Sequence, residues 1–382
     1  MERNKVHLGD VCKVVSGSTP KTGIPEYWNG DIKWITPAEI QEDSFYIYDS
    51  VRHITLLGKE KTGLSYMPKG TVILSSRAPI GKTAIAGCEM CCNQGFKNLI
   101  CSDKIFNEYL YYFLKGKEKY LNSLGRGATF KEISKKIVED IEIPLPNIKE
   151  QKHIATVLGC IDRVISLRQQ QLAKLDELVK ARFAEVFGDI NINDKGWDVE
   201  PLGRLCTIVR GASPRPIEKY LGGDVPWIKI SDATHGENIY LNKTKEYIIQ
   251  EGVSKSRKVK SGSLIFANCG VSLGFARIIT FDGCIHDGWL AMEDVNDRAN
   301  KIFLLQALNQ MTEHFREIAP AGTQPNLNTT IMKEYKQIIP PMCLQEEFVE
   351  FIDRVDKLRL QIEKSLEKLE TLKKALMQQY FG

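Results

Sequence analysis

Residues 172–188 read LAKLDELVKARFAEVFG, and residues 366–382 read LEKLETLKKALMQQYFG. Aligned at an offset of 194, the two stretches share eight identical residues, where background amino-acid frequencies would give about one. The chain therefore contains an internal repeat with a period close to half of its 382 residues. A repeat of this kind decides the architecture before any single motif does.

The same offset, drifting by one or two residues, aligns further motifs upstream. The paired motifs are Gly17-Ser-Thr-Pro20 with Gly211-Ala-Ser-Pro214, Gly30-Asp-Ile-Lys-Trp34-Ile35 with Gly223-Asp-Val-Pro-Trp227-Ile228, and Gly70-Thr-Val-Ile-Leu74 with Gly262-Ser-Leu-Ile-Phe266. In addition, Gly95-Phe96 recurs as Gly288-Trp289. Two copies of one module therefore make up the chain.

Each module has two parts. The first carries short β-type runs, such as residues 71–74 and 263–266, between Gly, Pro and Asn residues, which is typical of an α+β domain. The second follows a proline cluster, Pro144-Leu-Pro146 in one copy and Pro340-Pro341 in the other. Proline ends the preceding element and is tolerated where a helix begins. We therefore predict a long helix after each cluster.

Apolar residues recur in steps of three and four along both predicted helices, which indicates a narrow apolar stripe. A stripe needs a partner, and the matching helix of the other copy is the nearest one, so we predict an antiparallel coiled coil. Its predicted core is Leu158, Ile161, Ile165, Leu172, Leu175, Ile352, Val355, Ile362, Leu366 and Leu369, with Leu178 and Leu372. In the alternative arrangement, each helix packs only on its own domain.

The predicted fold class is α+β, a tandem repeat of two α/β domains separated by the two long helices. The expected boundaries are 1–147 for the first domain, 148–188 for the central helix, 189–340 for a linker and the second domain, and 341–382 for the C-terminal helix. Gln151 and Gln345 each follow the prolines closely. We expect them to fix the junction between domain and helix.

Composition and charge are those of an ordinary globular protein. The net charge is +4 from 52 basic and 48 acidic residues, and the pI near 8.4 falls short of the value above about 9 that marks a nucleic-acid-binding domain by charge alone. The sequence shows neither a membrane span nor a secretory signal. Ten cysteines in a chain without a signal indicate free thiols in a reducing compartment. We expect a soluble, cytoplasmic protein.

Several stretches imitate catalytic or metal-binding motifs. Residues 76–83 resemble a phosphate-binding loop, but Ser76 stands at the first glycine and the second copy has no lysine. Glu150 and Lys152 imitate a nuclease spacing, yet an acidic residue in a first helical turn is explained by the helix dipole. The C-x-x-C of residues 88–91 has no second pair of metal ligands at a suitable spacing. We predict no catalytic site and no metal site.

In this order, and twice, these motifs resemble the specificity (S) subunit of type I restriction–modification enzymes. The resemblance covers nearly the whole chain and includes Tyr27-Trp28 before Gly30, residues 127–129, residues 322–328, and the junction from Phe187 to Trp197. It implies a non-catalytic DNA reader with two target-recognition domains. Each domain would recognise one half of a split, asymmetric DNA site, and the paired helices would set the spacer between the halves.

Basic and amide side chains in the repeated loops are the expected DNA contacts, because arginine pairs with guanine and Asn or Gln with adenine. The candidates are Ser18, Thr19, Lys21, Lys33, Arg77, Lys82, Arg126, Thr129, Lys131, Arg210, Ser213, Arg215, Lys229, Asn268, Arg277, Gln324 and Asn326. Arg77 and Lys82 come first among them. Any of the basic residues could instead be solvated surface charge, and Gln324 and Asn326 could cap a helix or brace a turn.

The resemblance also implies partners. These are double-stranded DNA, methyltransferase subunits (two are expected) and motor–endonuclease subunits, with no membrane. S-adenosylmethionine, ATP and magnesium are expected on the partners, and no cofactor on this chain. Two other interpretations stay open: a coiled-coil scaffold that binds proteins without reading DNA, and an enzyme with an unfamiliar active site. Binding to duplex DNA that weakens steeply with salt would distinguish the DNA reader from the scaffold.

Overall fold

The computed structural model describes residues 4–126, 131–234, 239–270, 272–320 and 326–382. Its contacts divide the chain into two compact units, which we call the first unit (residues 1–169 with 364–382) and the second unit (residues 170–363). Each unit contains part of both long helices. This division differs from the boundaries expected from sequence, in which the helices stood apart from the two domains.

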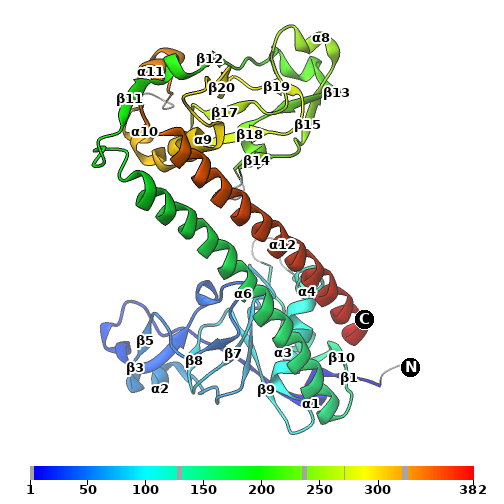
Figure 1. Cartoon of the computed structure of the whole chain (residues 1–382). Helices are drawn as coiled ribbons and strands as arrows, with labels where there is room; N and C mark the ends of the chain where they lie inside the picture. Colours follow the sequence, from blue (N-terminus) through cyan, green and yellow to red (C-terminus); the bar gives the residue numbers. More distant parts are fainter. Residues whose placement is uncertain (1–3, 127–130, 235–238, 271, 321–325) are drawn as a thin grey trace. The chain divides into compact units, whose positions relative to one another are not determined.

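The first unit is built on a five-stranded sheet (Figure 1). Its strand order is β2 (Cys12–Ser16), β9 (Lys97–Cys101), β6 (Val72–Leu74), β7 (Thr83–Ala86) and β4 (Tyr46–Ile47). A smaller sheet has the order β5 (His53–Ile54), β3 (Trp28–Ile35), β8 (Cys91–Cys92), and β1 (Lys5–His7) pairs with β10 (Glu142–Pro144). The helices are α1 (Leu8–Val11), α2 (Leu56–Thr62), α3 (Asn107–Gly116), α4 (Glu118–Leu124) and α5 (Lys135–Glu139).

The second unit repeats this plan. Its five-stranded sheet has the order β12 (Thr207–Arg210), β20 (Trp289–Glu293), β17 (Leu264–Ala267), β18 (Ala276–Ile279), β14 (Tyr240–Leu241). The smaller sheet is β15 (Glu246–Ile248), β13 (Leu221–Ile228), β19 (Gly283–Ile285), β16 (Arg257–Val259), and β11 (Asp198–Pro201) pairs with β21 (Lys336–Ile339). The helices are α7 (Leu202–Leu205), α8 (Gln250–Val253), α9 (Lys301–Gln310), α10 (Thr312–Ile318) and α11 (Thr329–Glu334).

Corresponding strands occupy the same places in the two large sheets. β2 and β12 lie at one edge, and β6 and β17 lie in the middle. The smaller sheet differs, because β16 adds a fourth strand to it in the second unit. The sequence repeat is therefore a repeat of the fold.

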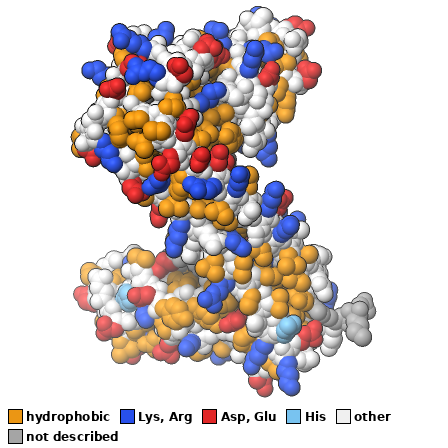
Figure 2. Space-filling view, viewed as in Figure 1, with side chains coloured by type: hydrophobic (Ala, Val, Ile, Leu, Met, Phe, Trp, Pro, Cys, Tyr) orange, Lys and Arg blue, Asp and Glu red, His pale blue; other side chains and the backbone are white. Residues whose placement is uncertain are grey.

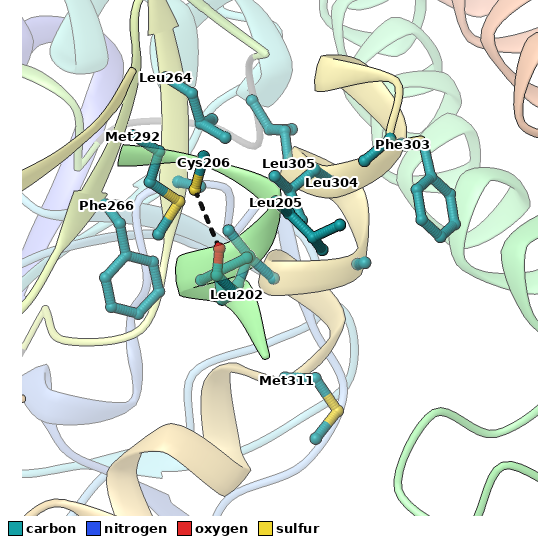
Figure 3. Packing of buried hydrophobic residues seen from close by; sticks show 14 of the residues in the cluster. Leu202, Leu205, Cys206, Leu264, Phe266, Met292, Phe303, Leu304, Leu305 and Met311 are labelled. Carbon is teal, nitrogen blue, oxygen red and sulfur yellow. Dashed lines mark hydrogen bonds between the residues drawn. The ribbon is translucent and has the colours of Figure 1, made fainter. Parts of the chain in front are cut away.

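Apolar side chains fill the space between each large sheet and its helices. In the second unit, Phe266 and Met292 of the sheet pack with Leu305 of α9 and Leu205 of α7 (Figure 3). Cys206 directly follows α7, and its thiol donates to the carbonyl of Leu202 at 3.5 Å within this core. In the first unit, Leu99, Tyr109 and Leu110 belong to the corresponding core.

The two long helices are α6 (Ile148–Phe187) and α12 (Met342–Phe381). Each begins within one residue of the segment expected from the sequence. In the first unit, Lys373 Nζ lies 2.6 Å from the Asp162 carboxylate. In the second unit, Arg182 pairs with Glu347 at 2.8 Å, so the residue numbers run in opposite directions along the two helices. The helices pair in antiparallel fashion, which confirms the predicted arrangement.

The residues of the predicted stripe are buried or partly buried in the structure. Leu158, Ile161, Ile352 and Val355 are buried, and the six other predicted core residues are partly buried, namely Ile165, Leu172, Leu175, Ile362, Leu366 and Leu369. The prediction is wrong for Leu178 and Leu372, whose residues are each 48% exposed. Both side chains turn outward from the helix pair.

Gln151 and Gln345 fix the junctions between the domains and the long helices. Both are fully buried. Gln151 Oε1 accepts from the Phe106 amide at 2.8 Å, and its Nε2 donates to the carbonyls of Lys104 and Pro146 at 3.0 and 2.8 Å. Gln345 makes the equivalent bonds in the second unit: its Oε1 accepts from the Asn300 amide, and its Nε2 donates to the carbonyls of Arg298 and Pro340. One side chain therefore joins a helix start to a neighbouring loop in each unit.

We expect the substitution Gln151→Leu to lower the free energy of unfolding by about 2–3 kcal/mol, because it leaves the Phe106 amide and two carbonyls without partners. Urea denaturation measures this change. Lys149→Leu, at an exposed position of the same helical turn, is the control and should have little effect. Equal losses for both variants would contradict the junction role of Gln151.

Candidate nucleic-acid interface

In each unit the repeated loops meet at one end of the large sheet, where β2 or β12 ends. The loop after β2 begins with Gly17, and the loop after β12 begins with Gly211. A Cβ atom added to these glycines would lie 1.9 Å from the Asn93 carbonyl oxygen and 2.1 Å from that of His286. Both positions therefore exclude any larger residue. We call this region the sheet end.

Tryptophans of β3 hold the loop at the sheet end of the first unit. Trp34 Nε1 donates to the Ser18 carbonyl at 3.0 Å, and Trp28 Nε1 donates to the Lys21 carbonyl at 3.2 Å. The Thr19 hydroxyl donates to the side-chain oxygen of Gln94 on the opposite segment. The Gly-Ser-Thr-Pro motif is thus fixed to β3 through Trp34 of the second repeated motif, and Trp28 holds the residue that follows it.

Arg77, Lys97 and Glu132 form an ionic group at this sheet end, which we call the Arg77 cluster. Glu132 Oε2 accepts from Arg77 Nε at 2.9 Å, and its Oε1 accepts from Lys97 Nζ at 3.0 Å. The Lys97 side chain is 8% exposed, whereas that of Arg77 is 45% exposed. Burial pushes the pKa of the Glu132 carboxyl upward, but the bonds from Lys97 and Arg77 outweigh it and hold this pKa below its usual value.

The sheet end of the second unit carries a different group, the Arg215 cluster, which consists of Ser213, Arg215, His286 and Asp287. Asp287 Oδ1 accepts from the Ser213 hydroxyl at 2.8 Å and lies 2.9 Å from His286 Nε2, while Oδ2 lies 3.3 Å from Arg215 Nη2. Arg210 Nε donates to the Asp287 carbonyl at 3.2 Å. Arg215 therefore pairs with the Asp287 carboxylate, while Arg210 binds the backbone of the same residue.

Local electrostatics favour the ionised form of the Asp287 carboxyl and the neutral form of the His286 imidazole. Burial raises the pKa of the Asp287 carboxyl, but the Ser213 hydroxyl, His286 and Arg215 together lower it by more than burial raises it. This pKa therefore lies below its usual value. Burial also lowers the pKa of His286, and the Asp287 carboxylate offsets this only in part. At neutral pH the cluster therefore presents the cation of Arg215 to the solvent.

Two predicted DNA contacts have other roles in the structure. Asn268 is fully buried, and its amide donates to Asn326 Oδ1 at 2.9 Å and to the Leu327 carbonyl at 3.2 Å. Arg277 is 6% exposed, and its guanidinium lies over the Phe275 ring. Because both are buried within the second unit, neither is retained among the proposed DNA contacts. The Asn326 side chain accepts one of these bonds from Asn268.

Three lysines of the candidate set are held outside the sheet-end clusters. Lys33 Nζ donates to the Cys88 thiol at 3.5 Å, and Lys82 Nζ donates to the Ile40 carbonyl at 2.7 Å. Lys229 pairs with Glu246. Each of these ammonium groups thus has a partner of its own and is less suited to a phosphate than an unpaired one.

The other candidates divide between exposed loops and parts of the chain that are not described. Lys21, Arg126, Lys131 and Arg210 are exposed, and the backbone of Arg126 forms a β-bridge with that of Glu132. Thr129 and Gln324 lie outside the described residues. Acidic and basic side chains are both spread over the visible face of each unit (Figure 2).

With this geometry in hand, comparison with known proteins identifies the family. A family model described as the type I restriction modification DNA specificity domain matches residues 2–177 and, a second time, residues 194–374. The chain belongs to this family. The two matched segments correspond to the two copies of the repeat, so the chain consists of two specificity domains.

A relative agrees with this assignment, and two solved structures are similar in fold. The chain is 31% identical over 396 residues to the type I restriction enzyme MjaIX specificity subunit of Methanocaldococcus jannaschii, covering 97% of this chain and 90% of the relative. It is similar in fold to the S subunit of a type I restriction–modification system from M. genitalium, with a TM-score of 0.60, 18% identity, and 100% and 97% coverage of the two chains. It is also similar in fold to a chain from a structural study of complex assembly and conformational transition of the type I R-M system. That comparison gives a TM-score of 0.64 at 18% identity and covers 99% of this chain and 97% of the other.

The specificity domains are not the catalytic part of such a system, whose activities lie in other subunits. Within the described ranges, no group of three or more His, Cys, Asp or Glu side chains is arranged to hold a metal ion. Nor is any helix there long and apolar enough to cross a membrane.

Several residues of the two clusters were missed at the sequence level. These are Lys97 and Glu132 in the first specificity domain, and His286 and Asp287 in the second. The repeat contained a partial signal for His286 and Asp287, because these residues directly precede the repeated Gly288, as Gln94 directly precedes Gly95. No comparable signal marked Glu132, which lies 55 positions after the arginine that it binds.

Proposed function

We propose that each unit reads one half of a bipartite, asymmetric DNA site at its sheet end. The observation that carries this proposal is that equivalent sheet ends present different polar side chains, Gln94 with Thr19 in one unit and Asp287 with Ser213 in the other. A shared scaffold with different contact groups is suited to reading two different half-sites. Phosphate contacts would position each domain, and base contacts would specify the sequence.

The partners would supply the chemistry. Methyltransferase subunits, two for each specificity chain, would carry S-adenosylmethionine, and motor–endonuclease subunits would use ATP and magnesium. The complex would act in the cytoplasm, where chromosomal DNA is accessible. The long helices would set the spacer between half-sites and provide the surface on which the methyltransferases dock.

Exposed apolar residues on the long helices define candidate docking positions. Val164 and Leu178 of α6 are 39% and 48% exposed, and the residues 194 positions later, Leu358 and Leu372 of α12, are 51% and 48% exposed. The first unit contains Val164 and Leu372, whereas the second contains Leu178 and Leu358. Each unit thus carries one equivalent pair, which suits one methyltransferase per unit.

We expect Leu178→Glu combined with Leu358→Glu to remove one methyltransferase from the complex, because a charge is costly in an apolar interface. Native mass spectrometry of the co-expressed complex should show a change from two methyltransferases per chain to one. Ala173→Glu with Ala181→Glu, at other exposed positions of α6, is the control. Retention of both copies would contradict docking at these residues.

The main experiment is a methylation map. The chain is co-expressed with its methyltransferase in a host that lacks adenine methylation, and modified adenines are located by direct sequencing. A motif with two defined halves and a fixed gap is the expected result. If the two proteins co-purify but leave no mark, and duplex DNA binding shows no dependence on salt, the proposed function fails and the scaffold interpretation replaces it.

A further inference from the structure

Each sheet end holds one exposed arginine whose guanidinium is anchored by a carboxylate. Arg77 is bound through Nε to Glu132 at 2.9 Å, and Arg215 through Nη2 to Asp287 at 3.3 Å. Their side chains are 45% and 81% exposed. The anchor occupies one edge of each guanidinium, so the remaining N–H groups stay available to a ligand.

The two carboxylates are themselves held in place. Lys97, which is nearly buried, fixes the second oxygen of Glu132. The hydroxyl of Ser213 and the ring of His286 fix the second oxygen of Asp287. An arginine held in this way loses little side-chain freedom when it binds, and such pre-organisation strengthens a directional contact.

The two arginine–carboxylate pairs do not occupy equivalent positions of the repeat. The backbones of Arg77 and Glu132 form a β-bridge in the first unit, and the corresponding β-bridge of the second unit joins Cys269 and Asn326, so neither member of the ion pair recurs there. Lys97, which follows Gly95-Phe96, has Leu290 as its counterpart, because Leu290 follows Gly288-Trp289 in the second unit. An arginine–carboxylate pair needed only for folding would be expected at equivalent positions. Because the pairs occupy different positions of one scaffold, we favour a role in ligand recognition that differs between the units.

We propose that Arg77 and Arg215 each bind a guanine in the major groove, one in each half-site, and that Glu132 and Asp287 are the residues that position them. Guanine presents O6 and N7 as neighbouring acceptors, which match two N–H groups of a guanidinium. This inference rests on the proposed DNA-reading function. It requires each half-site to contain at least one G·C pair at a fixed position.

The test uses the complex of the full chain with its methyltransferase and the methylation map described above. Arg77→Lys removes the bidentate edge but keeps the charge. We expect the preference for one G·C pair in the first half-site to fall by about tenfold or more, with all positions of the second half-site unchanged. Glu132→Gln should weaken the preference at that same position, because the anchor loses its charge.

Asp140→Asn is the matched control, since it neutralises the carboxylate of an exposed ion pair with Lys136 in the same unit. It should leave the motif unchanged. In the second unit, Arg215→Lys and Asp287→Asn should act on one G·C pair of the second half-site alone. The unaltered half-site reports in every case that the variant is folded and assembled.

The inference is overturned if a half-site contains no G·C pair, or if Arg77→Lys leaves every position unchanged. It is also overturned if Arg77→Lys lowers methylation equally at all sequences, because that result indicates a phosphate contact. These outcomes presuppose a bipartite motif in the unaltered protein. The absence of such a motif would instead reject the proposed function itself.

Discussion

The substitution Phe381→Ala is expected to lower the free energy of unfolding of the first unit by about 3–5 kcal/mol, through lost burial and the cavity that it leaves. The Phe381 residue is 6% exposed, and the centre of its ring lies 5.1 Å from that of Tyr109 and 5.7 Å from that of Phe113. Both partners belong to α3. The side chain thus attaches α12 to the core of the first unit.

Hydrogen exchange read by mass spectrometry measures this effect in each unit separately. Peptides from α3 should exchange faster in the Phe381→Ala variant, whereas peptides from α9 should not change. Phe187→Ala should give the reverse pattern, because Phe187 packs against Phe303 of α9. Gln378→Ala, at an exposed position of the same turn, is the control. Unaltered exchange in α3 would show that Phe381 does not stabilise the first unit.

Inserting seven residues into both long helices, after Gln170 in α6 and after Glu363 in α12, should lengthen the gap in the methylated motif by about three base pairs. Seven residues extend a helix by about 10 Å, and one base pair occupies about 3.4 Å along DNA. Seven residues also make nearly two full turns, so the apolar stripe stays aligned. Both half-sites should keep their sequences, and the methylation map measures the gap.

The control places the same insertion in α6 alone. The pairs Asp162–Lys373 and Arg182–Glu347 then cannot form together with their present partners, since only one helix has been lengthened. We expect this variant to be poorly assembled and to methylate weakly. An unchanged gap in the double-insertion variant would remove the spacer role from the helices.

Periodicity and repetition revealed the parts of this fold that depend on local sequence. The apolar stripes predicted α6 and α12, and the prolines marked where these helices begin. The prolines also drew attention to Gln151 and Gln345. Leu178 and Leu372 were misassigned, because steps of three and four do not distinguish a stripe position from its outward neighbour on a helix.

The sheet ends could be predicted only in part, because their contacts join distant segments. Arg77 and Arg215 were found from their residue type and loop position. Their carboxylate anchors could not be, because Glu132 and Asp287 are separated from them by 55 and 72 positions. Arg277 was misassigned for a related reason. It lies in β18 with its guanidinium over Phe275, and the sequence alone does not show whether a strand residue faces the core.

The first unit consists of two segments that are far apart in the sequence, and this separation affects the order in which the unit is synthesised. Residues 364–382 belong to this unit, yet they are synthesised 194 residues after Gln170, where its earlier segment has just ended. At about 5–20 residues per second, a ribosome needs roughly 10–40 s for that distance. The second unit is continuous in sequence and can complete its contacts earlier. The N-terminal half of the nascent chain therefore waits with the Phe381 site on α3 unfilled, and this interval is when chaperones and proteases have access to it.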